Sequence, residues 1–372
     1  MDTCDVVIVG GGPAGSACAW KLRQAGLDVV VIDAAVFPRD KVCAGWITAQ
    51  ILEELSIDAA AYGQHHTLQA ITGFRTGLIG GDQAVETLYG RPVAYGIRRC
   101  EFDHYLLQRS AARLRLGAPI ASIRREGDQW IVNDVVKAPA LVGAGGHFCP
   151  VARFVNGRIG GTPVVAAQEV EFMIDRAEDA RFTIDAETPE LYFCGDMQGY
   201  GWCFRKQHHL NIGFGRLDPR ALPKGTAGFL DFLKAKRKIP QDAGWRWRGH
   251  AYLVYQPGGR RVLDDGVLLV GDAAGLAYPQ SGEGIRPAIE SGLLAASTLI
   301  EAGGRYPRER LEPYQARLRG RFGASGLPSV LSDAVPARLK AALAASFLKV
   351  PWLVRHLVID GWFLHTRQPA LS

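Results

Sequence analysis

The residues best suited to chemistry begin with a glycine-rich turn near the start of the chain. Gly10 allows a tight turn, Gly12 lets a pyrophosphate group approach the backbone, and Gly15 lets a helix pack closely against a strand. The helix that follows offers free N–H groups and a partial positive charge to the pyrophosphate. Pro13 and Ala14, at the start of that helix, complete the predicted phosphate site.

An acidic residue ends the second strand of the same unit. Residues 5–9 and 27–32 are apolar and rich in β-branched side chains, so they predict two strands on either side of a helix over 14–24. Asp33, followed by Ala34, can accept hydrogen bonds from an adenosine ribose. Because its charge repels a ribose 2′-phosphate, this pocket favours FAD or NAD over NADP.

A second glycine-rich turn recurs far downstream. Gly271 and Asp272 follow an apolar strand, and Gly282, Gly284 and Ile285 precede a predicted helix. A strand, an acid and a helix start that recur so late predict that the chain returns to the same ligand. Such a return is typical of a flavoprotein rather than of a generic dinucleotide fold. The two turns together predict FAD as the cofactor.

Composition and cysteine usage narrow the class of protein. The chain has 372 residues, of which 48% are hydrophobic and 22% charged, as in ordinary globular enzymes. No apolar run reaches the roughly 18 residues that a membrane span needs, and we expect no signal peptide. Seven scattered cysteines without CxxC spacing favour a reducing, cytoplasmic location and argue against a zinc site.

The net charge of +6 is concentrated at the C-terminal end. From Arg305 onward, eleven Lys/Arg residues stand against four acidic ones. This excess predicts attraction to the anionic inner face of a membrane or to an acidic electron-donor protein, and a solvated helical face is the alternative. Residues 347–365 are apolar with Lys349, Arg355 and His356 between, which fits either a membrane interface or packing on the core. No nucleic-acid motif is present.

The elements that position these residues indicate an α/β protein with two interleaved parts. Alternating strands at 164–172, 191–196, 201–205 and 210–214, with a helix at 228–237, predict an antiparallel sheet inserted into the nucleotide domain. The predicted fold is a discontinuous Rossmann-like FAD-binding domain, an inserted antiparallel-sheet substrate domain and a helical C-terminal region. The ranges are 1–65, 92–160 and 262–305 for the FAD-binding domain, 66–91 and 161–261 for the substrate domain, and 306–372 for the helical region.

Six segments, in this order, resemble motifs of the geranylgeranyl reductase family, within the larger group of FAD enzymes built like para-hydroxybenzoate hydroxylase. They are the turn at 10–15, the loop Lys41-Val42-Cys43-Ala44-Gly45, Arg99 before Phe102-Asp103, the turn at 143–153, the run Tyr200-Gly201-Trp202-Cys203-Phe204, and Gly271-Asp272. The resemblance covers most of the chain up to Ile300. It implies a flavoprotein fold and an FAD cofactor.

The resemblance also implies roles for residues around the flavin. Asp272 is expected to accept a hydrogen bond from the ribityl chain, and the helix start near Gly284 to face the pyrimidine end of the isoalloxazine. Arg99 is expected to meet the phosphates or flank the flavin, with a surface ion pair as the alternative. Lys41, Cys43, Ala44 and Gly45 are assigned to the cofactor loop.

Catalytic and substrate-binding roles are assigned to a small further set. The Cys43 thiol is a candidate proton donor, and a buried small hydrophobe is the alternative reading. Tyr200, Trp202 and Phe204 alternate along one predicted strand, so they share a face that lines either a pocket over the flavin or the core. Cys43, Tyr200 and Trp202 are the predicted catalytic residues, and Pro279 joins the three aromatic residues in the predicted substrate pocket.

Two enzyme activities compete for this site. Reduced flavin could give hydride to a carbon–carbon double bond of an isoprenoid-like substrate, or it could activate oxygen and hydroxylate a small molecule. Gly275, Glu283 and Gly292 follow the reductase pattern, whereas Ala44 and Arg205 depart from it on the substrate side. Two further alternatives are a flavin halogenase, suggested by the spaced tryptophans of 245–247, and a non-enzymatic prenyl-binding escort protein.

Two sources of electrons for the flavin are compatible with the sequence. The sequence has no second complete βαβ nucleotide unit, so NADPH or NADH would bind only transiently. A separate donor protein, which the basic C-terminal region would suit, is the alternative.

Overall fold

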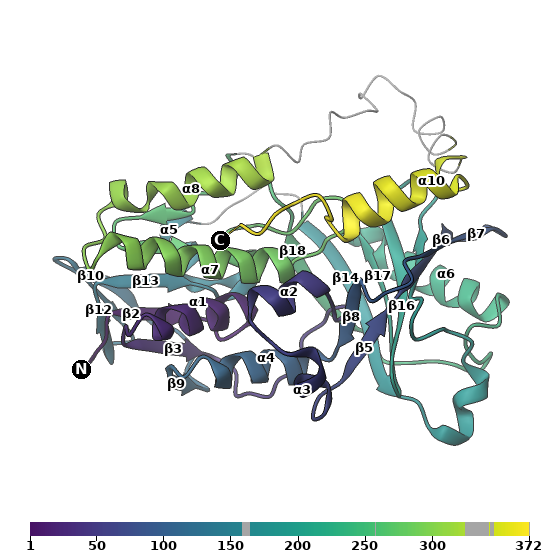
Figure 1. Cartoon of the computed structure of the whole chain (residues 1–372), viewed down its shortest axis with the longest axis horizontal. Coiled ribbons are helices and arrows are strands. Elements are labelled where there is room, and N and C mark those ends of the chain that lie inside the picture. The colour runs from purple at the N-terminus through teal and green to yellow at the C-terminus, as the bar shows by residue number, and fades with distance from the viewer. Residues whose placement is uncertain (158–163, 257, 324–341, 343–345, 372) are drawn as a thin grey trace.

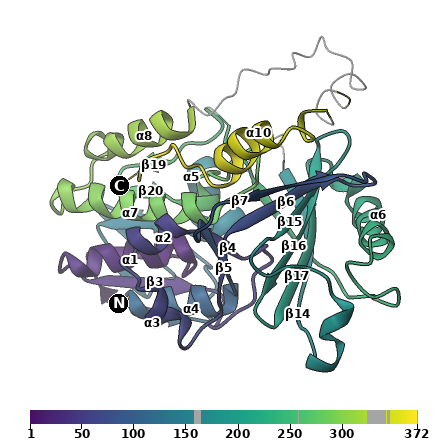
Figure 2. The same ribbon diagram turned by 45° about the vertical axis from the view of Figure 1, so that its right-hand side comes forward.

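The computed structural model of the protein describes residues 1–157, 164–256, 258–323, 342 and 346–371. Figures 1 and 2 show helices packed around a parallel sheet on one side and a large twisted sheet on the other. The C-terminal tail runs from the side of the large twisted sheet back across the side of the parallel sheet. This arrangement confirms the predicted fold class, a Rossmann-like domain combined with an antiparallel sheet and a helical C-terminal region.

The nucleotide-type sheet has six strands in the order β19-β20-β13-β2-β3-β9, all parallel except β19. Its central strands are buried along their whole length, as expected for a parallel sheet that is covered on both faces. The strands are β2 (Val6–Val9), β3 (Val29–Asp33), β9 (Arg113–Leu116), β13 (Ala140–Gly143), β19 (Leu263–Asp264) and β20 (Val267–Leu269).

Helix α1 (Pro13–Gln24) and helix α7 (Ile285–Ala302) bring the two glycine-rich turns together. Gly292 of α7 makes their close approach possible, since a Cβ atom there would lie 2.2 Å from the carbonyl oxygen of Ala14. Helix α4 (Arg99–Arg109) packs beside α1. The chain therefore does return to its first turn after about 260 residues, as the repeated motif predicts.

The second sheet has seven strands in the order β18-β14-β17-β16-β15-β6-β7. Among these strands only β15 and β6 pair in parallel. All seven fall inside the ranges predicted for the substrate domain, although the exact domain boundaries stay a prediction. The strands are β6 (Gly73–Leu78), β7 (Ala84–Leu88), β14 (Val164–Met173), β15 (Glu190–Phe193), β16 (Gly199–Lys206), β17 (His209–Arg216) and β18 (Arg248–Leu253).

Helix α6 (Leu222–Ala235) covers the outer face of this sheet, where Phe229 packs at Gly201. It begins six residues before the predicted start at 228, because a proline in its first turn is a helix-start signal that outweighs the local glycines. Strand β15 likewise ends at Phe193 rather than at 196, where Asp196 caps a turn through Gln198.

Smaller elements connect the two parts. A three-stranded sheet in the order β4-β8-β5 lies between them, and a four-stranded sheet in the order β1-β12-β11-β10 lies at the other end. The remaining strands are β1 (Asp2–Thr3), β4 (Trp46–Thr48), β5 (Leu68–Ile71), β8 (Ala94–Ile97), β10 (Ile123–Glu126), β11 (Gln129–Val132) and β12 (Val136–Ala138). The remaining helices and 3-10 turns are α2 (Ala49–Glu54), α3 (Ala59–Gly63), η1 (Gly146–Phe148), α5 (Pro150–Asn156), η2 (Arg176–Arg181), η3 (Pro219–Ala221), η4 (Gly271–Ala273) and α8 (Arg308–Gly323).

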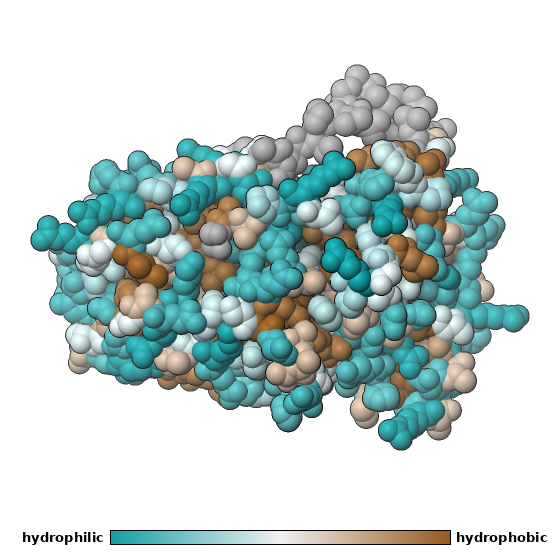
Figure 3. All heavy atoms as spheres, viewed as in Figure 1, coloured by the Kyte–Doolittle hydropathy of each residue, from teal (hydrophilic) through white to brown (hydrophobic). Residues whose placement is uncertain are grey.

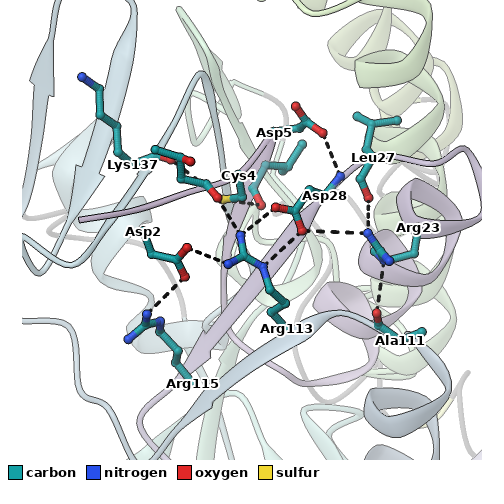
Figure 4. Close-up of polar contacts among 12 residues, drawn as sticks. Asp2, Cys4, Asp5, Arg23, Leu27, Asp28, Ala111, Arg113, Arg115 and Lys137 are labelled. Atoms are coloured by element: carbon teal, nitrogen blue, oxygen red, sulfur yellow. Dashed lines mark hydrogen bonds and ion pairs between the residues drawn. The ribbon is translucent and has the colours of Figure 1, made fainter.

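A cluster of ion pairs holds the N-terminal strand β1 next to β9, the edge strand of the parallel sheet (Figure 4). Arg113 of β9 donates to Asp2 at 2.6 Å and to Asp28 at 2.7 Å, and also to the carbonyl oxygen of Thr3 at 2.6 Å. Arg115 adds a second contact to Asp2 at 3.1 Å. The cluster is solvent-exposed, so it fixes the position of β1 more than it stabilises the fold.

The C-terminal tail forms helix α10 (Pro351–Leu353), which continues as the π-helical segment η5 (Val354–Phe363). We call residues 351–363 the tail helix. The side chains on its inner face are buried against aromatic residues beside the seven-stranded sheet, and the rings of Phe363 and Trp46 lie 6.3 Å apart. Packing on the core, one of the two interpretations of residues 347–365, is therefore confirmed for this side of the helix. No helix in the described part of the chain is long and apolar enough to span a bilayer.

Candidate functional site

A cavity of about 670 Å³ lies between the two glycine-rich turns and the seven-stranded sheet. Its volume is in the range typical of small-molecule and cofactor sites. The predicted cofactor residues that line it are Gly10, Gly12, Pro13, Ala14, Asp33, Ala34, Lys41, Cys43, Ala44, Arg99, Asp272, Gly282, Gly284 and Ile285. Segments from four distant parts of the sequence thus meet at one site.

The start of α1 fits a pyrophosphate group. Gly12 is the N-cap residue and no side chain caps this helix, so the first backbone N–H groups are free for a ligand. A Cβ atom on Gly12 would meet only the Arg39 guanidinium, at 3.4 Å, which shows that its side-chain position opens into the cavity. By contrast, a Cβ atom on Gly10 or Gly15 would lie within 2.3 Å of backbone oxygens. These two glycines serve chain packing, and Gly15 does not line the cavity.

Arg39 lines the same end of the cavity. Its Nη1 atom lies 3.3 Å from Asp103 but makes no hydrogen bond in the described structure, although it is buried. A half-buried guanidinium with a buried, unused N–H group fits an anionic ligand such as the FAD pyrophosphate. Arg39 was not among the residues predicted for the site.

Asp33 is held rigidly at the end of β3. Its two carboxylate oxygens accept hydrogen bonds from the backbone N–H groups of Gly11 at 2.7 Å and Ala35 at 2.8 Å. The carboxylate also lines the cavity, where its remaining lone pairs can accept hydrogen bonds from ribose hydroxyls. The position therefore suits the adenosine end of FAD.

Arg99 lines the cavity, but its guanidinium is bound to Asp103 through two hydrogen bonds of 2.8 Å. The ion pair that we considered as an alternative therefore exists, but it is buried rather than on the surface: Asp103 is 0% and Arg99 8% exposed. Burial alone lowers the pKa of Arg99, but Asp103 and the neighbouring Cys43 thiol outweigh burial and raise it. Arg99 is thus a fixed positive charge beside Cys43.

Lys41 and His250 form a second polar pair in the cavity wall. Lys41 Nζ lies 2.5 Å from His250 Nε2. Burial lowers the pKa of Lys41 to about 8, although Asp272 opposes the shift. Burial, with the positive charge of Lys41 added, lowers the pKa of His250 to about 3, so the imidazole is neutral and accepts from the ammonium.

Asp272 lies at the cavity wall at the start of the second turn. In the described residues no protein group donates a hydrogen bond to its carboxylate, which leaves it available to the ribityl hydroxyls of FAD. Gly284 keeps this space open, because a Cβ atom there would lie 3.3 Å from Asp272 Oδ1. Gly271 does not line the cavity and instead packs between Ala14 and Ala288.

Aromatic side chains of the seven-stranded sheet form the opposite wall. Tyr200 and Trp202 of β16 and Tyr252 of β18 line the cavity, and the rings of the first two lie 5.9 Å apart. Gly213 of β17 makes room for the indole, because a Cβ atom there would lie 2.0 Å from it. Trp202 Nε1 donates to Asn211 Oδ1 at 2.8 Å, which fixes the ring orientation.

Tyr200 keeps its proton. Its hydroxyl donates to the carbonyl oxygen of Ser281, and burial raises its pKa well above the ordinary value, with the neighbouring Tyr252 adding to the shift. A buried phenol that stays protonated can donate a hydrogen bond or a proton but cannot act as a base at neutral pH.

The loop that carries Cys43 is supported from the sheet side. Asn211 Nδ2 donates to the carbonyl oxygen of Cys43 at 3.1 Å. Gly45 has a φ of +67°, and a Cβ atom there would lie 2.3 Å from Lys206 Nζ, so only glycine allows this approach. Lys206 is itself buried and paired with Glu171 at 2.6 Å. Gly45 therefore positions the loop but does not line the cavity.

Two predicted substrate-pocket residues lie away from the cavity lining. Phe204 is 1% exposed and stacks on Trp46 at 6.2 Å, beneath the tail helix. Pro279 belongs to the turn before Gly282 but does not reach the cavity wall. Trp46 takes the place expected for Phe204, because it stands between that ring and the cavity and is itself a lining residue.

Glu283 is a lining residue with a shifted pKa. Burial raises its pKa to about 7, although the backbone N–H of Arg286, which donates to Oε1 at 2.7 Å, opposes the shift. Its Oε2 atom is buried without a hydrogen-bond partner in the described structure. The folded protein therefore binds this proton more tightly than the unfolded chain does.

This shift predicts a pH-dependent effect of Glu283→Gln on stability. Since the folded pKa of about 7 exceeds the unfolded value of 4.5, the stability that Glu283 supports is present at low pH and lost as the pH rises toward 7. We expect Glu283→Gln to raise the free energy of unfolding by about 2 kcal/mol at about pH 8 and to change it little at about pH 4. Thermal unfolding at both pH values measures this, and an equal change at both would refute the assignment.

Comparison with known proteins places this site in a class. Residues 5–81 match a family model described as FAD dependent oxidoreductase. A menaquinone reductase of Mycobacterium tuberculosis is 30% identical over 321 residues, which cover 80% of this chain and 77% of that protein. A digeranylgeranylglycerophospholipid reductase of Methanothrix thermoacetophila is 28% identical over 342 residues, which cover 86% of this chain and 84% of that protein.

Solved structures share the fold. A geranylgeranyl bacteriochlorophyll reductase-like protein of Thermoplasma acidophilum is 22% identical, covers 96% of this chain and 99% of its own, and gives a TM-score of 0.73. A flavin-dependent brominase is 17% identical with a TM-score of 0.70 and covers 96% of this chain and 91% of its own. At such identities the likeness concerns the fold alone.

The cavity and these similarities define an FAD-dependent oxidoreductase. Within that class, the chain belongs to the geranylgeranyl reductase family, as the order of its motifs predicts.

Proposed function

We propose that this enzyme reduces carbon–carbon double bonds in an apolar, isoprenoid-like substrate. The observation that carries the proposal is the cavity itself, which joins the cofactor turns to a wall of Trp46, Tyr200, Trp202 and Tyr252. Such a wall suits an apolar chain rather than a charged substrate. The names of two relatives, a menaquinone reductase and a digeranylgeranylglycerophospholipid reductase, support the same reaction.

The residues of the chain supply binding, orientation and protons for this reaction. When bound, reduced FAD supplies the hydride. Asp272, Asp33 and the start of α1 would hold the cofactor through its ribityl, ribose and pyrophosphate groups. The aromatic wall would exclude water and orient the alkene beside it.

The proton that completes the reduction must come from a group that carries one at neutral pH. Cys43, Tyr200 and Trp202 line the cavity and remain the predicted catalytic residues. The raised pKa of Tyr200 keeps its hydroxyl protonated at neutral pH, so a proton is present at this position.

The electron source is a second part of the proposal. We propose that NADPH or NADH reduces the flavin transiently, or that a separate donor protein does so. Anaerobic bleaching of the flavin by excess NADPH would favour the nicotinamide route.

Product analysis under nitrogen tests the proposed reaction. Protein with chemically reduced FAD is mixed with a geranylgeranyl lipid, and the masses of the products are measured by mass spectrometry. We expect products that gain two hydrogens for each reduced bond, both under nitrogen and in the first turnover under air. A product that forms only under air and gains an oxygen atom would favour the monooxygenase alternative instead.

A further inference from the structure

We propose that the outer face of the tail helix docks on an anionic lipid surface. Val350, Trp352 and Leu357 are 43%, 63% and 44% exposed on this face. Leu88, at the end of β7, is 55% exposed and lies next to the tail helix, since Arg355 donates to its carbonyl oxygen at 3.4 Å. We call these four residues the outer patch. Figure 3 shows apolar residues at the position of this helix in Figure 1.

The outer patch is concentrated rather than scattered. Twelve large apolar residues are exposed in the described part of the chain, and four of them belong to this one patch. Single exposed apolar residues are normal on a soluble surface, whereas a group of them marks an interaction site. An exposed tryptophan beside basic residues is the combination that interfacial helices use.

The charges around the outer patch select an anionic partner. In the described residues 346–371, Lys349, Arg355 and Arg367 are basic, and Asp360 is the one acidic residue. Asp360 is already bound, since it accepts from Tyr89 Oη at 2.6 Å and lies 3.2 Å from His356. Lys349 is exposed, and the Arg355 guanidinium lies over the Tyr89 ring. An anionic bilayer complements both features, because its charge attracts the basic residues and its headgroup region accommodates the exposed Trp352 ring.

The inner face of the same helix connects the docking surface to the cavity. Val354, Val358 and Phe363 are buried against the cluster that contains Trp46, and Trp46 lines the cavity. One helix thus separates the outer patch from the aromatic wall. Docking through the outer patch would place the cavity near a lipid-borne substrate, and this consequence rests on the proposed function. The docking itself does not depend on the proposed function.

Vesicle sedimentation tests the proposal on the purified, full-length protein. Vesicles of phosphatidylcholine with added phosphatidylglycerol should bind the protein, and vesicles of phosphatidylcholine alone should bind it less, with binding reduced by high salt. Trp352→Ser should lower the partition coefficient about tenfold. Met173→Ser is the matched control, because Met173 is exposed to a similar extent, at 69%, but lies outside the outer patch. Retained flavin absorbance would show that each variant is folded.

Three outcomes would overturn the docking proposal. The wild-type protein could fail to sediment with anionic vesicles, or Trp352→Ser could bind them as the wild type does. Light scattering could instead show a dimer that Trp352→Ser dissociates, with no vesicle binding, which would assign the outer patch to a second copy of the chain. Vesicle binding without double-bond reduction would refute the proposed function and leave the docking surface intact.

Discussion

Gly12→Val is expected to give a folded protein that does not retain FAD. The backbone of Gly12 has a φ of −72°, which valine adopts without strain, and its side-chain position opens into the cavity. The added methyl groups would therefore occupy the place of the pyrophosphate rather than clash with protein. We expect the affinity for FAD to fall about a hundredfold or more. Visible absorbance of the purified protein and titration with FAD measure this, while circular dichroism confirms the fold.

Gly15→Ala separates packing from cofactor binding. Its Cβ atom would lie 1.9 Å from the carbonyl oxygen of Gly10, so this smaller substitution should lower the yield of folded protein itself.

A yellow Gly12→Val protein with unchanged FAD affinity would contradict the assignment of this turn to the pyrophosphate.

Asp103→Ala is expected to cause the largest loss of stability among single substitutions near the site. Asp103 is completely buried, accepts two hydrogen bonds from Arg99, and lies 3.3 Å from Arg39. Removing it leaves a buried guanidinium without its counter-charge, which costs about 3–5 kcal/mol. Urea unfolding followed by circular dichroism measures the change.

Asp82→Ala is the matched control for this experiment. Asp82 also pairs with a cation, Lys236, at 2.9 Å, but its side chain is 98% exposed. We expect its removal to leave the unfolding midpoint unchanged, because solvent screens an exposed pair. If Asp103→Ala were as mild as Asp82→Ala, the buried ion pair would not be a structural requirement of the site.

The sequence was sufficient for the parts of the site whose requirements are local. Gly10, Gly12 and Gly15 have roles set by the turn itself, and Asp33 and Asp272 follow strands whose apolar runs are plain in the sequence. The FAD fold and the meeting of the two turns could be predicted for that reason.

The parts of the site that were not predicted depend on contacts between residues far apart in the sequence. His250 reaches the cavity because β18 pairs with β14, which sets His250 opposite Ala167, another lining residue. Phe204 does share the face of Tyr200 and Trp202, as strand alternation requires, but the tail helix and Trp46 cover it. Both contacts join residues about 160 positions apart, so no local pattern reveals them.

The i, i+4 spacing of Arg99 and Asp103 was a signal that could have been used. Such a pair on one helix face predicts an ion pair, although not its burial. The burial depends on α4 packing beside α1 and on Arg39 closing over it, neither of which is local.

The most direct test of the account is to follow the flavin spectrum during a single anaerobic turnover. The FAD-loaded protein is reduced completely, oxygen is excluded, and a polyprenyl substrate is added. We predict that the visible absorbance of oxidised flavin returns in proportion to the substrate added, because the electrons pass to carbon–carbon double bonds. If the flavin stays reduced until oxygen is admitted, the enzyme is not a double-bond reductase.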